Sequence, residues 1–186
     1  MIIGLTGKNA SGKGEVAKYL KTKDFVYYSL SEILREEATR RDIEHSRGNL
    51  INLGNELRDK FGPSVLARKT NEKIHQNKEK NIVVDSIRSP FEAKELMKNK
   101  GFLLVGIDAP IELRFKRLLE RNRLGDAKTL AEFKKQEQRE NLKSDTNQQL
   151  DETFKLAQEV ILNDGALKEL YKKVDVLLNN YKKNFT

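Results

Sequence analysis

The stretch Gly4–Leu20, GLTGKNASGKGEVAKYL, decides the fold of this chain. An apolar run leads into it, and a helical pattern ends it. Between the two, Gly7, Gly12 and Lys13 give the spacing G-x-x-x-x-G-K. Glycines let the backbone turn tightly and aim its N–H groups at phosphate oxygens, and the helix that follows adds its positive end. The stretch therefore predicts a strand, a phosphate-binding loop and a helix, with Lys13 reaching the outer phosphates of a nucleotide.

The rest of the chain alternates apolar runs with helical patterns. After the opening run at residues 1–6, strands are expected at 25–30, 81–86, 102–108 and 159–164, with helices at 14–21, 31–41 and after Gly165. Strands that are apolar on both faces and separated by helices are typical of a parallel sheet covered on both sides. Such a sheet binds ligands at the carboxyl ends of its strands. We expect an α/β fold, a five-stranded parallel sheet flanked by helices, of the P-loop NTP hydrolase type.

Two polar segments lie between these elements. Residues 42–80 are polar with a helical pattern, and we expect them to form an excursion over the sheet edge. Residues 121–150 are highly charged and poor in apolar side chains, which is typical of a mobile helical flap. A chain of 186 residues suits one domain. Neither segment needs to be a domain of its own, so we expect a single P-loop domain over residues 1–186.

Composition narrows the classes of function. The chain has no cysteine and two histidines, His45 and His75, which excludes disulfides and thiolate metal sites and disfavours a zinc enzyme. No apolar run approaches the ~20 residues of a membrane span, and the opening MIIGLTG has no basic leader. We therefore expect a cytoplasmic protein without a membrane partner. The net charge of +8 fits a polyanionic partner, either a nucleic acid or a phosphorylated small molecule, although surplus lysines also simply solvate a surface.

The residue after Lys13 refines the interpretation of the loop. The Walker A pattern has Ser or Thr there to touch Mg²⁺, whereas this chain has Gly14. The ending GKG resembles the loop of adenylate kinases and related nucleoside monophosphate kinases, which hold magnesium largely through water. A threonine usually follows in those enzymes, and Glu15 stands in its place here, so the metal shell is left open. The resemblance implies ATP and Mg²⁺ as cofactors, with ATP contacted by Gly7, Lys8, Asn9, Ala10, Ser11, Gly12, Lys13, Gly14 and Glu15.

The second strand leads into YSLSEILRE, which resembles the acceptor site of the same kinases. There a hydroxyl residue precedes a helix whose leucine–arginine pair grips the acceptor monophosphate, which implies acceptor roles for Ser29 and Arg35. The guanidinium fork of arginine suits this role because it meets phosphate oxygens in a bidentate way. Alternatively, Arg35 is an exposed helix residue paired with Glu32 or Glu36. The acceptor-binding helical region would span about residues 31–80.

The third strand ends in NIVVDSIRSPFEA. By the same resemblance, Asp85 would hold magnesium through water, and Arg88 would be the second clamp on the acceptor phosphate. Glu92 occupies the place of a glutamine that reads the acceptor base in adenylate kinases, and the stretch also resembles phage deoxynucleoside monophosphate kinases. A loop cap for Asp85 and a solvated helix start for Glu92 remain alternatives. Arg58, in a segment similar to those enzymes and to dephospho-CoA kinases, is a further acceptor candidate, with a structural role as its alternative.

Later arginines complete the predicted site. Arg117 and Arg121 lie at i and i+4 on one helix face. The resemblance implies that Arg117 leans on the donor base or phosphates, that Arg121 faces the transferring group, and that Arg139 returns from a lid over about residues 121–150. The alternative is a cluster on a solvated face. The closing VILNDG resembles a segment that borders the donor base, which implies ATP contacts at Asn163 and Gly165; a simple strand-to-helix turn is compatible with that.

These residues lead to one expected function with two alternatives. The resemblance implies ATP-dependent phosphoryl transfer to a nucleoside or deoxynucleoside monophosphate, with catalytic roles for Lys13, Arg88, Arg117, Arg121 and Arg139. A dephospho-CoA kinase-like enzyme is the first alternative; it would need a base for its hydroxyl acceptor, which YYSLSEI does not offer in the usual place. The second is a non-catalytic P-loop module that binds nucleotides or nucleic acid. Because the arginines cluster at expected strand ends, we expect a small nucleotide and not nucleic acid as partner. A monomer and a homodimer both remain open.

Overall fold

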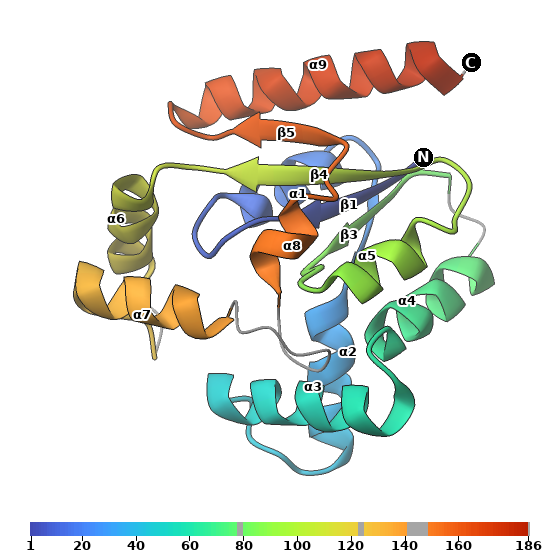
Figure 1. The fold of residues 1–186 in the computed structure, drawn as a ribbon. Coiled ribbons are helices and arrows are strands. Elements are labelled where there is room, and N and C mark those ends of the chain that lie inside the picture. The colour runs from blue at the N-terminus through green and yellow to red at the C-terminus, as the bar shows by residue number, and fades with distance from the viewer. Residues whose placement is uncertain (78–79, 123–124, 141–148, 186) are drawn as a thin grey trace.

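A parallel sheet forms the centre of the molecule. The computed structural model describes residues 1–77, 80–122, 125–140 and 149–185 (Figure 1). The five strands lie in the order β2-β3-β1-β4-β5, and every neighbouring pair is parallel. Their bounds are β1 Ile2–Thr6, β2 Val26–Ser29, β3 Ile82–Asp85, β4 Phe102–Asp108 and β5 Glu159–Leu162. The expected five-stranded parallel sheet is thus confirmed, and the carboxyl ends of its strands meet along one edge.

Two helices cover one face of this sheet. They are α1 (Lys13–Lys21) and α9 (Leu167–Phe185), whose buried residues form one core with Ile3 and Leu5 of β1. Both residues are fully buried, together with Val83, Val105 and Ile107 of the neighbouring strands. Because alternate residues of a strand point to opposite faces, these central strands are apolar throughout and bury both sides.

The opposite face is covered by the helices that follow β2 and β3, and by the short helix before β5. They are α2 (Leu30–Arg40), α3 (Arg47–Phe61), α4 (Val65–Gln76), α5 (Pro90–Leu96) and α8 (Leu150–Phe154). Their core joins Leu66 and Leu96 to Val84 and Leu104 of the sheet. Helix α3 lies below the sheet in Figure 1, whereas α4 packs Leu66 and Ile74 into the core that it shares with the strands.

Two further helices stand beside the carboxyl ends of the strands. These are α6 (Ile111–Arg121) and α7 (Leu130–Glu140), which pack on each other through Leu118, Ala127 and Phe133. Within the charged segment 121–150, residues Leu130–Glu140 form a helix, which is the structure expected for that segment. The low content of apolar residues in this segment is typical of a mobile flap, yet Phe133 of α7 is fully buried.

The last strand departs from the expected pattern. In β5, Ile161 is buried against α9, but Val160 is 55% and Leu162 is 44% exposed. The expectation of two buried faces is wrong for this strand, because β5 is at the edge of the sheet and its second face is left largely uncovered. In the described part of the chain, no helix has the length and apolar character that crossing a bilayer requires.

Candidate functional site

The loop between β1 and α1 has a backbone that demands its glycines. Gly7 and Gly12 have φ values of 142° and 107°, which side chains rarely allow. A Cβ at Gly7 would also overlap the carbonyl oxygen of Ile107, and one at Gly12 would overlap the side-chain amide of Asn163. Ala10 adopts a positive φ of 59° as well. The loop is therefore held in a tight conformation by both its own backbone and its surroundings.

The same loop presents a set of main-chain donors. Among the residues that the structure describes, no acceptor is found for the N–H groups of Lys8, Asn9, Ala10, Gly12 and Gly14. Lys13 reaches back over the loop, and its Nζ donates to the carbonyl oxygens of Gly7 at 2.6 Å and Lys8 at 2.9 Å. Main-chain donors, an ammonium group and a helix N-terminus together form a setting that suits an anion.

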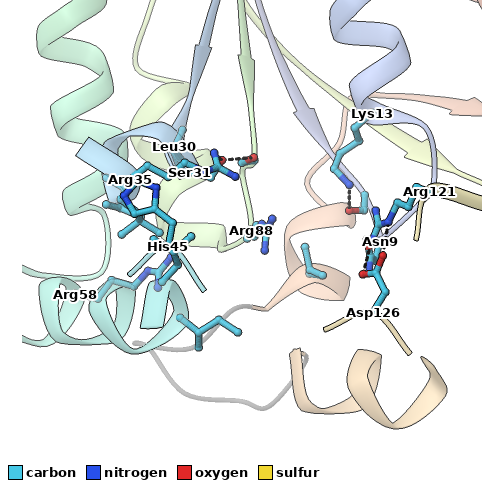
Figure 2. Close-up of a pocket in the computed structure, with 17 residues that line it drawn as sticks. Asn9, Lys13, Leu30, Ser31, Arg35, His45, Arg58, Arg88, Arg121 and Asp126 are labelled. Atoms are coloured by element: carbon cyan, nitrogen blue, oxygen red, sulfur yellow. Dashed lines mark hydrogen bonds and ion pairs between the residues drawn. The ribbon is translucent and has the colours of Figure 1, made fainter. Parts of the chain in front are cut away.

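A pocket of about 320 Å³ connects this loop to the helices that follow β2 (Figure 2). Figure 2 shows Lys13, Asn9 and Arg121 on one side, Arg35 and His45 on the other, and Arg88 between them. The pocket thereby brings together several residues predicted from widely separated parts of the sequence, namely Gly7, Asn9, Lys13, Arg35, Arg58, Arg88 and Arg121. Phosphate-binding chemistry is thus present at two ends of one cavity.

Hydroxyl groups line the far half of the pocket. Ser29 ends β2, but its side chain is buried and its Oγ contacts the Oγ atoms of Ser31 at 2.9 Å and Ser86 at 3.2 Å. Ser31 and Ser86 line the pocket, and Ser29 does not. The expected direct contact of Ser29 with an acceptor is therefore wrong for this arrangement, because Ser29 lies behind the two serines that face the cavity.

Arg35 remains available on the pocket side of α2. Its side chain is exposed, and its Nη1 donates to the Oγ of Ser31 at 3.2 Å. Within the described residues it forms no ion pair with Glu32 or Glu36, since Glu36 pairs with Lys73 at 2.6 Å. The alternative, in which Arg35 forms an ion pair with a glutamate of its own helix, is therefore not found among the described residues.

Glu92 corrects a second expectation. Its carboxylate is fully buried and completes a capping box with Ser89 at the start of α5. It accepts hydrogen bonds from the N–H of Arg88 at 2.9 Å and from Nη2 of Arg58, also at 2.9 Å. Glu92 cannot read an acceptor base from this position, because its oxygens are enclosed and already bonded. Arg58 lines the pocket, but its guanidinium is held by this buried ion pair.

On the donor side, Arg117 and Asn163 meet beside the loop. Nη2 of Arg117 donates to the main-chain oxygen of Asn163 at 3.1 Å and to its Oδ1 at 3.3 Å. The Asn163 side chain in turn donates to the carbonyl of Ser11 at 2.8 Å. Burial lowers the pKa of Arg117. Neither residue lines the pocket, and Gly165 is exposed in the turn before α9.

Arg121 lines the pocket in a bidentate ion pair. Its Nε and Nη2 donate to the two oxygens of Asp126 at 2.8 Å and 2.7 Å. Arg139 belongs to α7, and its side chain lies outside the described residues. Two side chains expected to contact ATP form ion pairs: Glu15, in the first turn of α1, with Lys18 at 2.7 Å, and Lys8 with Asp151 at 3.2 Å. The expected ATP contact of Glu15 thus has a competing partner on its own helix.

Asp85 is the carboxylate expected to hold magnesium through water, and it lies next to the pocket residue Ser86 without lining the pocket itself. Asp85 ends β3; its Oδ1 accepts the N–H of Ser86 at 2.6 Å and its Oδ2 faces the Tyr27 hydroxyl at 3.4 Å. A carboxylate oxygen has lone pairs left for a metal-bound water after one such contact. Over the described ranges, no three carboxylate or imidazole groups gather as a metal cage. Mg²⁺ commonly uses one or two carboxylates together with substrate phosphates.

Several pocket residues escaped sequence analysis. They are Leu30, His45, Leu50, Ile51, Leu66, Asp126 and Leu150, in addition to Ser31 and Ser86. Most of them come from the polar segments 42–80 and 121–150, where no motif fixes a role. The two serines stood next to predicted residues, so adjacency to Ser29 and Asp85 was the one available signal.

The chain is similar to known proteins in sequence and in fold. A family described as an AAA domain matches residues 3–141. Over 190 aligned residues, the chain is 33% identical to a UPF0200 protein of Pyrococcus horikoshii, and the match covers 100% of both chains. Among solved structures, shikimate kinase of Aquifex aeolicus aligns with a TM-score of 0.54 at 17% identity, over 97% of both chains.

A gluconokinase of Sinorhizobium meliloti aligns with a TM-score of 0.59 at 13% identity, over 98% of this chain and 94% of that one. Likeness at such low identity establishes that the chain shares its fold with these two kinases. The relation to UPF0200 proteins is closer, because a third of the residues are identical over the full length. The chain therefore belongs to the UPF0200 family and is built on an AAA domain.

Proposed function

We propose that this protein transfers the outer phosphoryl group of ATP to the phosphate of a nucleoside or deoxynucleoside monophosphate. One observation supports this most directly: a single pocket has the glycine-rich loop and Lys13 at one end, Arg35 at the other, and Arg88 between them (Figure 2). Phosphoryl transfer between two phosphates needs alignment and neutralised charge more than covalent chemistry. A cavity with cations at both ends meets that need.

The donor would occupy the loop. The phosphates of ATP would accept hydrogen bonds from the loop N–H groups, and Lys13 would exchange the carbonyls of Gly7 and Lys8 for phosphate oxygens, which are stronger acceptors. Mg²⁺, held through water by Asp85, would offset charge on the phosphates. The base would lie toward Arg117, Asn163 and Gly165, as the resemblance to adenylate kinases implies.

The acceptor would occupy the far half. Its phosphate would contact Arg35 and Arg88, with Ser31 as a neutral donor, and its nucleoside would pack on aliphatic side chains such as Leu34 and Ile51. Arg121 would leave Asp126 to approach the transferring group, and Arg139 would join it from α7.

The carboxylates of the pocket favour an acceptor that is already anionic. A hydroxyl acceptor needs a base to take its proton. Among the described residues that line the pocket, two side chains are candidate bases, and both are already engaged. Asp126 accepts hydrogen bonds from Arg121 on both oxygens, and Nε2 of His45 lies 3.0 Å from Oγ1 of Thr39. This disfavours a dephospho-CoA kinase-like reaction. The convergence of arginines on a cavity also favours a small nucleotide over nucleic acid.

An activity panel tests the proposal. Each common ribo- and deoxynucleoside monophosphate, and dephospho-CoA, is incubated with ATP and Mg²⁺, and ADP release is measured. We expect transfer to at least one monophosphate. Lys13→Ala should lower turnover by about 10³-fold without changing the melting temperature, whereas Lys172→Ala, at an exposed position of α9, should change neither. An active, folded Lys13→Ala protein would refute the proposal, as would transfer to dephospho-CoA alone.

A further inference from the structure

Two side chains from outside the loop each hold one of its carbonyl groups. Nη1 of Arg114, in α6, donates to the carbonyl oxygen of Asn9 at 3.3 Å. Nδ2 of Asn163, after β5, donates to the carbonyl oxygen of Ser11 at 2.8 Å. Arg114 and Asn163 are 4% and 5% exposed, and neither lines the pocket.

The residues that follow these carbonyls share two properties. Ala10 and Gly12 have positive φ values of 59° and 107°, and within the described chain their N–H groups meet no acceptor. In a trans peptide, the carbonyl and the N–H of the next residue point in opposite directions. A carbonyl held on the outer side of the loop therefore directs the following N–H toward the inner side.

We propose that Arg114 and Asn163 are positioning residues that aim the N–H groups of Ala10 and Gly12 at the phosphates of the donor nucleotide. This inference rests on the proposed nucleotide binding at the loop. The two anchors reach the loop from different elements, Arg114 from α6 and Asn163 from the position after β5, so each can fix its own peptide of the loop. Without them, rotation of the Asn9–Ala10 or Ser11–Gly12 peptide would present a carbonyl oxygen to a phosphate, which repels it.

Both anchors are themselves held firmly. Nε of Arg114 donates to the carbonyl of Ala109 at 2.9 Å, and its two Nη atoms pair with Glu137 of α7, with Nη2 at 3.1 Å from Oε2. The ring of Phe133 lies 5.5 Å from its guanidinium. Asn163 is fixed by its own N–H, which donates to Asp108 at 2.7 Å, and by Arg117.

This arrangement links α7 to the loop. Because Glu137 orients the same guanidinium that contacts Asn9, the seating of α7 determines how well the Ala10 N–H is aimed. The buried ion pair therefore has a role in nucleotide affinity beyond that of holding two helices together.

The first experiment replaces the Asn163 amide. Asn163→Asp keeps the shape but turns the donor toward Ser11 into an acceptor, and Asn179→Asp makes the same change at an exposed site on α9. Dissociation constants for Mg·ATP are measured by calorimetry, together with kcat. We expect Asn163→Asp to weaken ATP binding by about tenfold or more, with a much smaller change of kcat at saturating ATP, and Asn179→Asp to match the wild type.

The second experiment separates positioning from stability. Arg114→Met alone leaves Glu137 buried without its Arg114 partner, and is expected to lower the melting temperature. Arg114→Met with Glu137→Leu replaces the pair by apolar side chains, which is commonly neutral for stability. The double variant should regain its melting temperature while its ATP dissociation constant stays about tenfold weaker, because the contact with Asn9 is still missing.

The outcomes separate a failure of the proposed nucleotide binding from a failure of the positioning roles of Arg114 and Asn163. A wild-type protein that binds no ATP contradicts the proposed function. A wild-type protein that binds ATP, with Asn163→Asp equal to it, overturns the positioning role of Asn163. Recovery of both melting temperature and affinity in the double variant shows that Arg114 is structural alone and overturns its positioning role.

Discussion

Gly12 and Gly14 lie in the same loop but differ in what a side chain would meet. A Cβ at Gly14 has open space around it, whereas one at Gly12 would overlap Asn163 and would be forced to a φ of 107°. We predict that Gly14→Ser folds with an unchanged melting temperature and lowers the Mg²⁺ concentration for half-maximal activity, because it restores the hydroxyl that commonly touches the metal.

Gly12→Ala is the matched comparison. It should lower the melting temperature and abolish ATP binding, because it strains the backbone and displaces the Asn163 side chain. Thermal unfolding and calorimetry on both variants check this pair. Equal stability of the two proteins would contradict the packing argument.

Tyr27, in β2 beside Asp85 at the end of β3, makes the free energy of unfolding depend on pH. Burial, and next the charge of Asp85, raise the pKa of Tyr27 to about 12, against about 10 in an unfolded chain. Between those pH values the unfolded chain releases a proton that the folded chain keeps, so the free energy of unfolding falls as pH rises. The stability that is linked to the raised pKa of Tyr27 is therefore fully present below about pH 10 and is lost as pH rises toward about 12.

Tyr27→Phe should remove this part of the decline. Urea unfolding of both proteins from pH 9 to 12 measures it, and the difference between them isolates Tyr27 from the lysines that titrate in the same range. Parallel curves for the two proteins would show that Tyr27 titrates alike in both states.

At the scale of elements, the Arg58–Glu92 pair joins α3 to α5. Glu92→Ala removes the capping box and leaves Arg58 buried without its carboxylate, which should cost about 3–5 kcal/mol of unfolding free energy. Glu152→Ala breaks an ion pair of similar length, 2.7 Å against 2.9 Å, but on the surface of α8. It should have little effect, because water replaces the lost partner.

Urea unfolding of these two variants compares a buried pair with an exposed one at nearly equal distance. A small effect of Glu92→Ala would mean that α5 is held by its apolar contacts alone. The acceptor half of the pocket would then not depend on this pair, although Glu92 also holds the N–H of Arg88.

For α7 and β5, the sequence pattern does not predict correctly how much of the element is buried. The segment 121–150 has few apolar residues, yet α7 buries Phe133 against Leu118 and Ala127. In β5, the apolar run predicted two buried faces, yet Val160 and Leu162 are exposed. Local pattern identifies a helix or a strand, but the number of faces that it buries depends on its neighbours, and β5 has a strand on one side only.

At the scale of the whole molecule, one pocket joins the loop with Lys13 to the side of Arg35. We therefore predict that a single ligand can occupy both ends of this pocket. Two nucleosides joined by five phosphates should bind at least 10²-fold more tightly than ATP, because the second contact becomes intramolecular. Arg88→Ala should reduce that advantage more than it weakens ATP itself, since Arg88 lies in the central part of the pocket (Figure 2).

Calorimetry with ATP and with the joined ligand provides the comparison, and a nucleoside triphosphate extended by phosphates alone is the control for charge. Equal affinity for ATP and the joined ligand would indicate one nucleotide site, and would contradict a two-nucleotide reaction.

The sequence by itself determined which elements follow one another along the chain. It showed the apolar runs of the strands, the glycine-rich loop with the helix after it, and the arginines that come after the ends of strands. These features depend on backbone freedom and on periodicity within short stretches, which sequence records directly. It also placed Lys13, Arg35, Arg88 and Arg121 at what proved to be one pocket.

Only the tertiary structure decided what each polar side chain touches. Glu92 was expected at a base and is enclosed with Arg58, and Ser31 faces the pocket where Ser29 was expected. Arg114 and Asn163 hold loop carbonyls from 105 and 152 residues away in sequence. Such contacts arise when strands β1, β4 and β5 align, and the same charged or amide side chain is solvated, paired or enclosed according to that alignment.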